Sequence, residues 1–253
     1  MLRSAEEVIG YRLLATDDDI GQVKDFLFDD QLWTVRYLVA DTGGWLSERL
    51  VLIAPVSLGQ PHWQSRLFPV VLTKEQIENS PGIETDRPFS RQQEADLTKY
   101  YGWPVYWPAY FGGEGLLGFG PAPVSPETAR RIQEEEARRR ESEDPHLRSV
   151  EEVTGYHIQA ADGEIGHVED FILDDEDWVI RYMVVDTRNW LPGKKLLVAP
   201  GWVESIDWSE SKVAVDLSRE EIKDSPEYDA LAPVNREYEV RLYDYYGRPK
   251  YWS

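Results

Sequence analysis

The chain has 253 residues, enough for two domains of ordinary size, and 42% of them are hydrophobic, so we expect a folded protein. Its 47 acidic and 27 basic residues give a net charge of -20, which repels phosphate groups and argues against nucleic acid as a direct partner. It has no cysteine, which excludes disulfides, thiolate nucleophiles and cysteine-bound zinc.

The first residues and the length of the apolar runs indicate the location of the protein in the cell. Glu6 and Glu7 stand where a secretory signal peptide needs an apolar run. No stretch of the sequence approaches the roughly 18 apolar residues of a membrane span. We therefore expect a cytoplasmic protein that is not inserted in a membrane.

An internal repeat organises the sequence. Residues 4–107 align without a gap with residues 149–252, and about 40% of the aligned positions are identical, which indicates a tandem duplication. We therefore predict three parts. They are a first unit at 1–107, a linker with a charged helix at 108–148, and a second unit at 149–253.

Each unit begins with a series of short strands. In the first unit we expect them at residues 11–15, 20–28, 33–42, 50–53, 56–58 and 67–72. In the second unit the last three are expected at 196–198, 202–206 and 212–217, and the others 145 positions after their first-unit counterparts. Val35, Tyr37 and Val39 alternate with other residues at the period of a half-buried strand. Strands of this length and spacing, separated by turn residues, favour a small closed or partly open barrel.

Two short helices and an aromatic hook follow the strands of each unit. Hydroxyl or amide residues that cap a helix start, and glycines that end a helix, mark these helices. The capping residues are Thr73, Ser90, Ser218 and Asn235 at the starts and Gly102 and Gly247 at the ends. The hooks have the pattern Pro-x-Tyr-Trp at 104–107 and 249–252.

The strand motifs resemble those of the PRC-barrel family. The motifs are a Gly-x-x-Val-x-Asp-Phe start, an acidic turn, a Trp-x-x-Arg-Tyr-x-Val-x-Asp-Thr strand and the proline that ends the next strand, and they cover residues 4–72 and 149–217. Members of this family include the cytoplasmic domain of the H subunit of purple-bacterial photosynthetic reaction centres and the C-terminal domain of a ribosome-maturation factor. The resemblance implies a mainly β protein with short helices (α+β). With the duplication, we predict two small PRC-type β-barrels in tandem, each followed by a two-helix aromatic tail. Because both units then have the same surfaces, we expect pseudo-two-fold symmetry between them.

Histidines offer little support for catalysis. None of His62, His146, His157 and His167 has a histidine 145 positions away, so no catalytic histidine is duplicated with the fold. A hydrolytic or metal-dependent site in the second barrel, formed by His157, His167 and Glu169, remains an alternative. We predict instead that the protein is not an enzyme and has no catalytic residues.

Charged clusters have a functional and a structural interpretation. The acidic stretches 17–19, 29–30 and 174–177 could bind a hard cation, but turn formation by aspartate explains them as well. Arg36 and Arg181 could bind an anion, but each could also pair with an aspartate of its own sheet. We favour the structural interpretation in both cases and predict no metal and no cofactor.

The ten Trp and fourteen Tyr residues exceed what two small barrels can bury, so we expect some of them at interfaces. The candidate interface residues are Trp103, Tyr106, Trp107, Tyr245, Tyr246, Tyr251 and Trp252. The predicted function is that of a bacterial scaffold or adaptor. Its faces with these residues would bind a protein partner, or a second copy of the chain in a homo-oligomer. An electron-transfer accessory similar to the photosynthetic H subunit is the other alternative.

Overall fold

The computed structural model describes residues 1–46, 49–83, 90–106, 146–187 and 194–252. We call residues 1–106 the first half and residues 146–252 the second half. The predicted linker with its charged helix, at 108–148, lies outside the described residues except for its last three positions, and Trp107 lies outside them as well. The division into three parts therefore stays a prediction.

The first half forms a mostly antiparallel sheet. Its strands are β2 (Arg12–Leu14), β3 (Asp19–Asp29), β4 (Thr34–Asp41), β5 (Leu50–Ile53) and β6 (Leu67–Pro69). They pair in the order β5-β4-β3-β2-β6, with β2 and β6 parallel. Val35, Tyr37 and Val39 are buried, as their alternation predicts. Leu38 is buried too, so both faces of β4 are covered.

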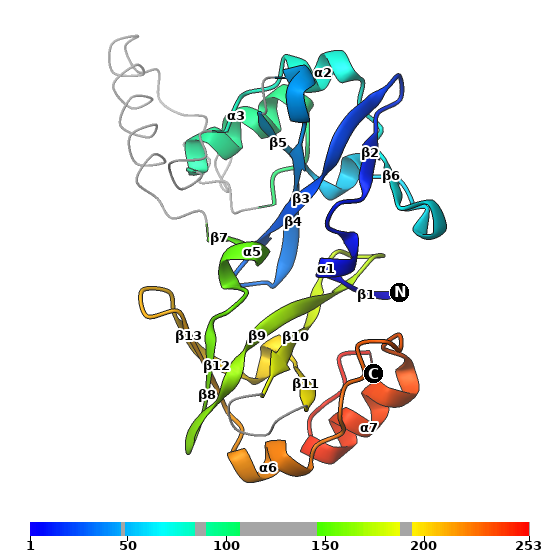
Figure 1. Cartoon of the computed structure of the whole chain (residues 1–253). Coiled ribbons are helices and arrows are strands. Elements are labelled where there is room, and N and C mark those ends of the chain that lie inside the picture. Colours follow the sequence, from blue (N-terminus) through cyan, green and yellow to red (C-terminus); the bar gives the residue numbers. More distant parts are fainter. Residues whose placement is uncertain (47–48, 84–89, 107–145, 188–193, 253) are drawn as a thin grey trace, which may run out of the picture.

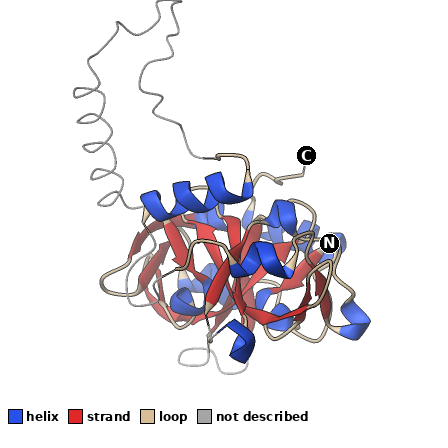
Figure 2. Cartoon of the chain, turned by 90° about the horizontal axis from the view of Figure 1, so that it is seen from above, coloured by secondary structure: helices blue, strands red, loops and turns tan. Residues whose placement is uncertain are grey.

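The second half forms a sheet with the same order of corresponding strands. Its strands are β8 (His157–Ala160), β9 (Gly163–Asp174), β10 (Ile180–Asp186), β11 (Lys195–Val198), β12 (Val203–Asp207) and β13 (Lys212–Val215). They pair in the order β11-β10-β9-β8-β13-β12, and here β8 and β13 are parallel. A mainly β protein with short helices is thus confirmed, and Figure 2 shows the strands in the middle with helices around them.

We predicted small barrels, closed or partly open, and the sheets that the structure describes are not closed barrels. Within the described residues, the strand pairing of each sheet follows an open path, and its two end strands are not hydrogen-bonded to one another. In the first half, a 3-10 turn at Pro55–Ser57 directly follows β5, and the residues after the turn bridge to Leu67 and Val70. The other end strand, β6, has three residues and bonds this segment, with the Gly59 N–H donating to the Pro69 carbonyl at 2.8 Å.

The helices begin and end at the predicted residues. They are α2 (Lys74–Glu78), α3 (Arg91–Tyr101), α6 (Arg219–Asp224) and α7 (Arg236–Tyr246). Capping boxes start α2 at Thr73, α3 at Ser90 and α6 at Ser218, and the Asn235 side chain caps α7. Gly102 and Gly247 end α3 and α7 in the left-handed conformation. Within the described ranges, no helix has both the length and the apolar character needed to cross a membrane.

The two halves exchange their first strands. Strand β1 (Leu2–Ser4) pairs with β9 of the second half, and β7 (Leu147–Ser149) pairs with β3 of the first half. A short helix follows each exchanged strand, α1 (Ala5–Val8) and α5 (Val150–Val153), and Figure 1 shows both helices where the two sheets meet. A bridge between Thr34 and Val179 adds a third connection between the sheets.

The apolar side chains of both halves form one continuous core. Phe26, Val39, Phe171 and Val184 are all buried, as we predicted from their strand positions. Trp178 of the second half packs on Phe26 of the first half, with ring centroids 6.1 Å apart. The halves are therefore held together by shared packing as well as by strand pairing.

Candidate functional site

Two equivalent sets of hydrogen bonds hold the exchanged strands in place, and we call each set a lock. The Ser4 hydroxyl donates to Asp170 at 2.5 Å, and the backbone N–H of Glu6 donates to the same carboxylate at 3.0 Å. In the reverse direction, Ser149 donates to Asp25 at 2.5 Å and the N–H of Glu151 donates to it at 3.0 Å. Each half therefore supplies one serine and one aspartate to the seam between the halves.

Burial changes the acidity of both lock aspartates. Loss of water around the carboxylates raises the pKa of Asp25 and Asp170, and the hydrogen bonds from the serines oppose this increase only in part. Because the folded state binds these protons more tightly than the unfolded chain does, their contribution to the free energy of unfolding is largest at low pH. It is lost as the pH rises through the folded-state pKa values.

This titration predicts how stability changes with pH. We expect the double variant Asp25→Asn, Asp170→Asn to lose less unfolding free energy than the wild type between acid and neutral pH, measured by denaturant titration at several pH values. Glu204→Gln, which neutralises an exposed acid on β12, should keep the wild-type slope. An unchanged slope in the double variant would contradict the assignment.

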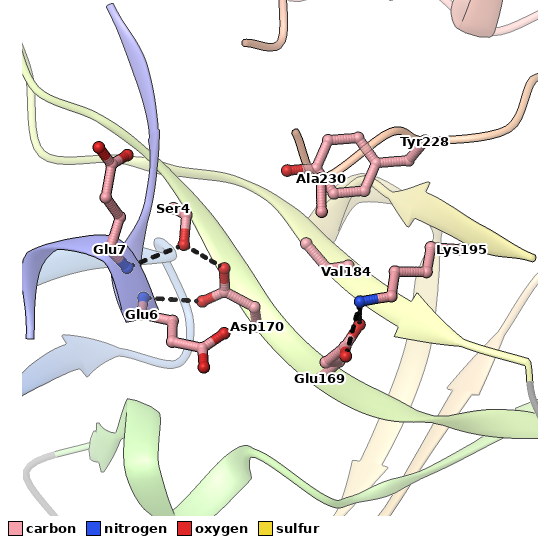
Figure 3. A pocket seen from close by; sticks show the side chains of 9 residues that line it. All are labelled: Ser4, Glu6, Glu7, Glu169, Asp170, Val184, Lys195, Tyr228 and Ala230. Atoms are coloured by element: carbon pink, nitrogen blue, oxygen red, sulfur yellow. Dashed lines mark hydrogen bonds and ion pairs between the residues drawn. The ribbon is translucent and has the colours of Figure 1, made fainter. Parts of the chain in front are cut away.

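A pocket of about 280 Å³ opens beside the Ser4–Asp170 lock (Figure 3). On its far side Lys195 pairs with Glu169 at 2.7 Å, and Tyr228 lies over the same wall. Burial raises the pKa of Tyr228 to about 12, so its hydroxyl stays protonated at neutral pH. A second cavity of about 260 Å³ is lined by both Asp25 and Asp170, which places the two locks next to one another.

The predicted interface residues of the second tail pack mainly on their own half. Tyr246 lies against Trp202 with ring centroids 4.9 Å apart, and Trp252 lies against Tyr243 at 5.1 Å. The Tyr245 hydroxyl donates to the backbone carbonyl of Glu221 at 2.7 Å. These contacts attach the Pro-x-Tyr-Trp hook to α7, and they attach α7 to α6 and to the turn before β12.

The first tail and Tyr251 are held by buried acids. Tyr106 and Tyr37 both donate to Glu94, which is fully buried on α3, and burial raises the pKa of this carboxyl group. In the second half Tyr251 and Tyr182 donate to Glu239, each at 2.7 Å. We did not predict these buried glutamates. The only signal for them in the sequence is that each copy of the repeat has Glu at this position.

Two grooves lie along the seam, and the tails form part of their walls. The first groove, of about 190 Å³, lies between Trp103 and Tyr106 of the first tail and Trp178 of the second half, with Val56 also in its lining. The second groove, of about 390 Å³, lies between Tyr251 of the second tail and Trp33 of the first half, with Leu32 also in its lining. Trp103 is itself fixed by a hydrogen bond from its indole nitrogen to Ser57 at 2.8 Å.

A family model confirms the resemblance to the PRC-barrel family for the strands at the start of the first half. Residues 2–57 match the model of the PRC-barrel domain. The chain contains a PRC-barrel domain. An uncharacterized protein of Deinococcus radiodurans is similar, with 33% identity over 75 residues, which is 30% of this chain. The match spans 27% of that relative's length, so the similarity concerns one region of each protein.

The matched PRC-barrel domain includes one strand of each exchanged strand pair. It contains β1 with Ser4, and it contains Asp25 on β3, which receives Ser149 from outside the matched region. It also contains the acidic turn at Asp29–Asp30, where Asp30 pairs with Arg148 at 2.9 Å. In the corresponding turn, Asp175 pairs with the amino group of Met1 at 2.5 Å. In both acidic turns, an aspartate therefore pairs with a positively charged group from the other half.

The two strand arginines also have partners. Arg36 lies 3.5 Å from Asp29, and Arg181 lies 3.3 Å from Asp174 in the second half. Each guanidinium group also stacks on a tail tyrosine, at 3.8 Å from the Tyr106 ring for Arg36 and 4.4 Å from the Tyr251 ring for Arg181. These arginines connect strands β4 and β10 to the tails.

The histidine alternative lies outside the PRC-barrel match, on β8 and β9. His157 and His167 face one another across these strands, and His157 lies 3.1 Å from Glu164. Glu169 pairs with Lys195 and not with either histidine. Among the described residues, no three His, Asp or Glu side chains are grouped so that they could hold a metal ion.

Proposed function

We propose that this chain is a cytoplasmic tandem PRC-barrel scaffold or adaptor without enzymatic activity, which binds a protein partner in the two seam grooves or associates with itself. The observation that supports the proposal is that both grooves are built alike. Each is lined by the aromatic tail of one half and by a tryptophan that follows the acidic turn of the other half, Trp178 or Trp33. Aromatic residues in grooves of this kind anchor protein partners.

The same positions of the repeat form both grooves, which supports a pseudo-two-fold relation between the halves. Trp33 and Trp178 are 145 positions apart, as are Tyr106 and Tyr251, and the arginines beneath these tyrosines have the same spacing. Two similar grooves on one body would allow one chain to hold two partners, or two segments of one partner, and linked contacts of this kind increase overall affinity.

The grooves differ in size because some lining residues differ between the copies. Val56 in the first groove corresponds to Gly201 in the second, which leaves more room. Asp177 at the first groove corresponds to Leu32 at the second, so the second groove is also less acidic. We therefore expect the second groove to bind the larger side chains of a partner.

Exposed apolar residues on the grooves provide the test. We expect Leu32→Lys and Val56→Lys to remove the co-purifying partner, because a charged side chain opposes apolar contact. Val71→Lys is the matched control, since Val71 is 61% exposed, like Val56 at 61% and Leu32 at 62%, and lines neither groove. Equal loss in the control, or an inert monomer under all conditions, would contradict the proposal.

The two alternative functions stay predictions. A hydrolytic or metal-dependent site would require His157, His167 and Glu169 to act together, whereas Lys195 pairs with Glu169. An electron-transfer accessory would have to associate with a membrane complex, and co-fractionation with membranes would distinguish it from the scaffold proposed above.

A further inference from the structure

The exchanged strands carry the same sequence and use the same register. Strands β1 and β7 both read Leu-Arg-Ser, and a short acidic helix follows each of them. Leu2 pairs with Asp174, and Leu147 pairs with Asp29, so the two pairings are equivalent under the 145-residue repeat. We call residues 2–8 and residues 147–153 the two arms, and β9 and β3 their receptor strands.

The bonds between arm and receptor are local to those segments. In each lock, one serine hydroxyl and one backbone N–H of the arm reach a single aspartate of the receptor. On receptor strand β3, Lys24 pairs with Glu151 of arm 147–153 at 3.0 Å. None of these contacts requires that the arm and the receptor belong to the same molecule.

The connection between the halves sets no geometric barrier to exchange between molecules. The 39 residues 107–145 join the halves, and a chain of that length can reach on the order of 130 Å when extended. Tethering gives the halves of one molecule an effective concentration on the order of millimolar relative to one another. A second copy therefore competes when the protein concentration is high while the seam forms.

From these observations we infer that the seam is an exchangeable interface whose second partner is another copy of this chain. The first half of one copy pairs with the second half of another, and the reverse pairing completes a closed dimer with two intact seams. The inference deepens the self-association part of the proposed function, but it uses the arms and receptors and not the grooves.

Engineered disulfides test the exchange directly, because the chain has no cysteine of its own. Leu2 and Asp174 are directly opposed in the antiparallel pair, and such positions have Cα atoms within the range that a disulfide spans. One chain carries Leu2→Cys and a second chain carries Asp174→Cys. The two are mixed, unfolded in denaturant, refolded together at high protein concentration and then oxidised.

We expect the mixed disulfide dimer to form several-fold more than in a control in which Leu231→Cys replaces Asp174→Cys. Leu231 is 96% exposed, so it reports random collision of refolded chains. A single chain with both Leu2→Cys and Asp174→Cys should form an internal disulfide, which shows that the pair can be bridged. Yields of the mixed dimer no higher than the Leu231 control would overturn the inference.

Light scattering of the cysteine-free chain provides a second readout that does not depend on disulfide geometry. After refolding at the same high concentration, we expect a dimer that persists when diluted, and a monomer alone would also overturn the inference. Groove variants Leu32→Lys and Val56→Lys should refold to the same dimer. Their behaviour separates failure of this inference from failure of the groove proposal.

Discussion

The variant Phe171→Ala should lose about 3–5 kcal/mol of unfolding free energy, the usual loss when a large buried side chain is truncated. Phe171 is fully buried on β9, and its ring centroid lies 5.8 Å from that of Phe28 in the first half. The substitution therefore leaves a cavity where the two halves meet. We expect the melting temperature to fall by on the order of 10 °C for a chain of this size.

The matched control is Val71→Ala, because Val71 is an apolar residue that lies just after β6 and is largely exposed. Its unfolding free energy should stay within about 0.5 kcal/mol of the wild type, as for most surface substitutions. Denaturant titration of both variants measures the difference. A wild-type midpoint for Phe171→Ala would show that this residue is not in the core.

Gly166→Ala should be destabilising by more than about 2 kcal/mol, because backbone strain alone costs about 1–3 kcal/mol where only glycine fits. Gly166 has a φ of 153°, and a Cβ atom there would overlap the carbonyl oxygen of Asp186 on β10. The close approach of the two strands leaves no room for the methyl group to move away.

The control for this substitution is Gly201→Ala in the same half. A Cβ atom at Gly201 meets nothing within 4 Å, and its backbone does not require glycine. We expect a change within about 0.5 kcal/mol of the wild type. Equal melting temperatures for the two variants, measured by circular dichroism, would argue against the close strand approach at Gly166.

Features set by residues near one another in sequence were predictable. The capping box of Thr73 depends on a residue three positions later, and the helix end at Gly102 depends on one residue that tolerates a left-handed backbone. The burial of Phe26 and Phe171 followed from strand periodicity in the same way. In each case the decisive residues lie within a few positions of the feature.

The exchange of first strands was not predictable from local patterns. Ser4 has the same chemistry as Ser149, and Asp25 has the same chemistry as Asp170, so the sequence does not say which serine bonds to which aspartate. Barrel closure could not be predicted for a related reason. It depends on whether two distant edge strands meet, and nothing within either strand determines that.

The tails show what composition alone does not determine. The surplus of aromatic rings suggested an interface, and Tyr246 and Trp252 also pack on rings of their own half. The buried Glu239 that holds Tyr251 could not be recognised from its type, because glutamate is rarely buried. Whether a partner or a second chain covers the rest of the tails stays a prediction.

The central claim is that the two halves form one body because each completes the sheet of the other. Residues 1–106 and 146–253 should therefore be expressed as separate chains and examined alone and after mixing, by circular dichroism and light scattering at low concentration. We expect that neither piece folds as a monomer, and that the mixture forms a one-to-one complex with a cooperative unfolding transition. Two pieces that each unfold cooperatively as monomers, with the midpoint of the intact chain, would contradict the claim.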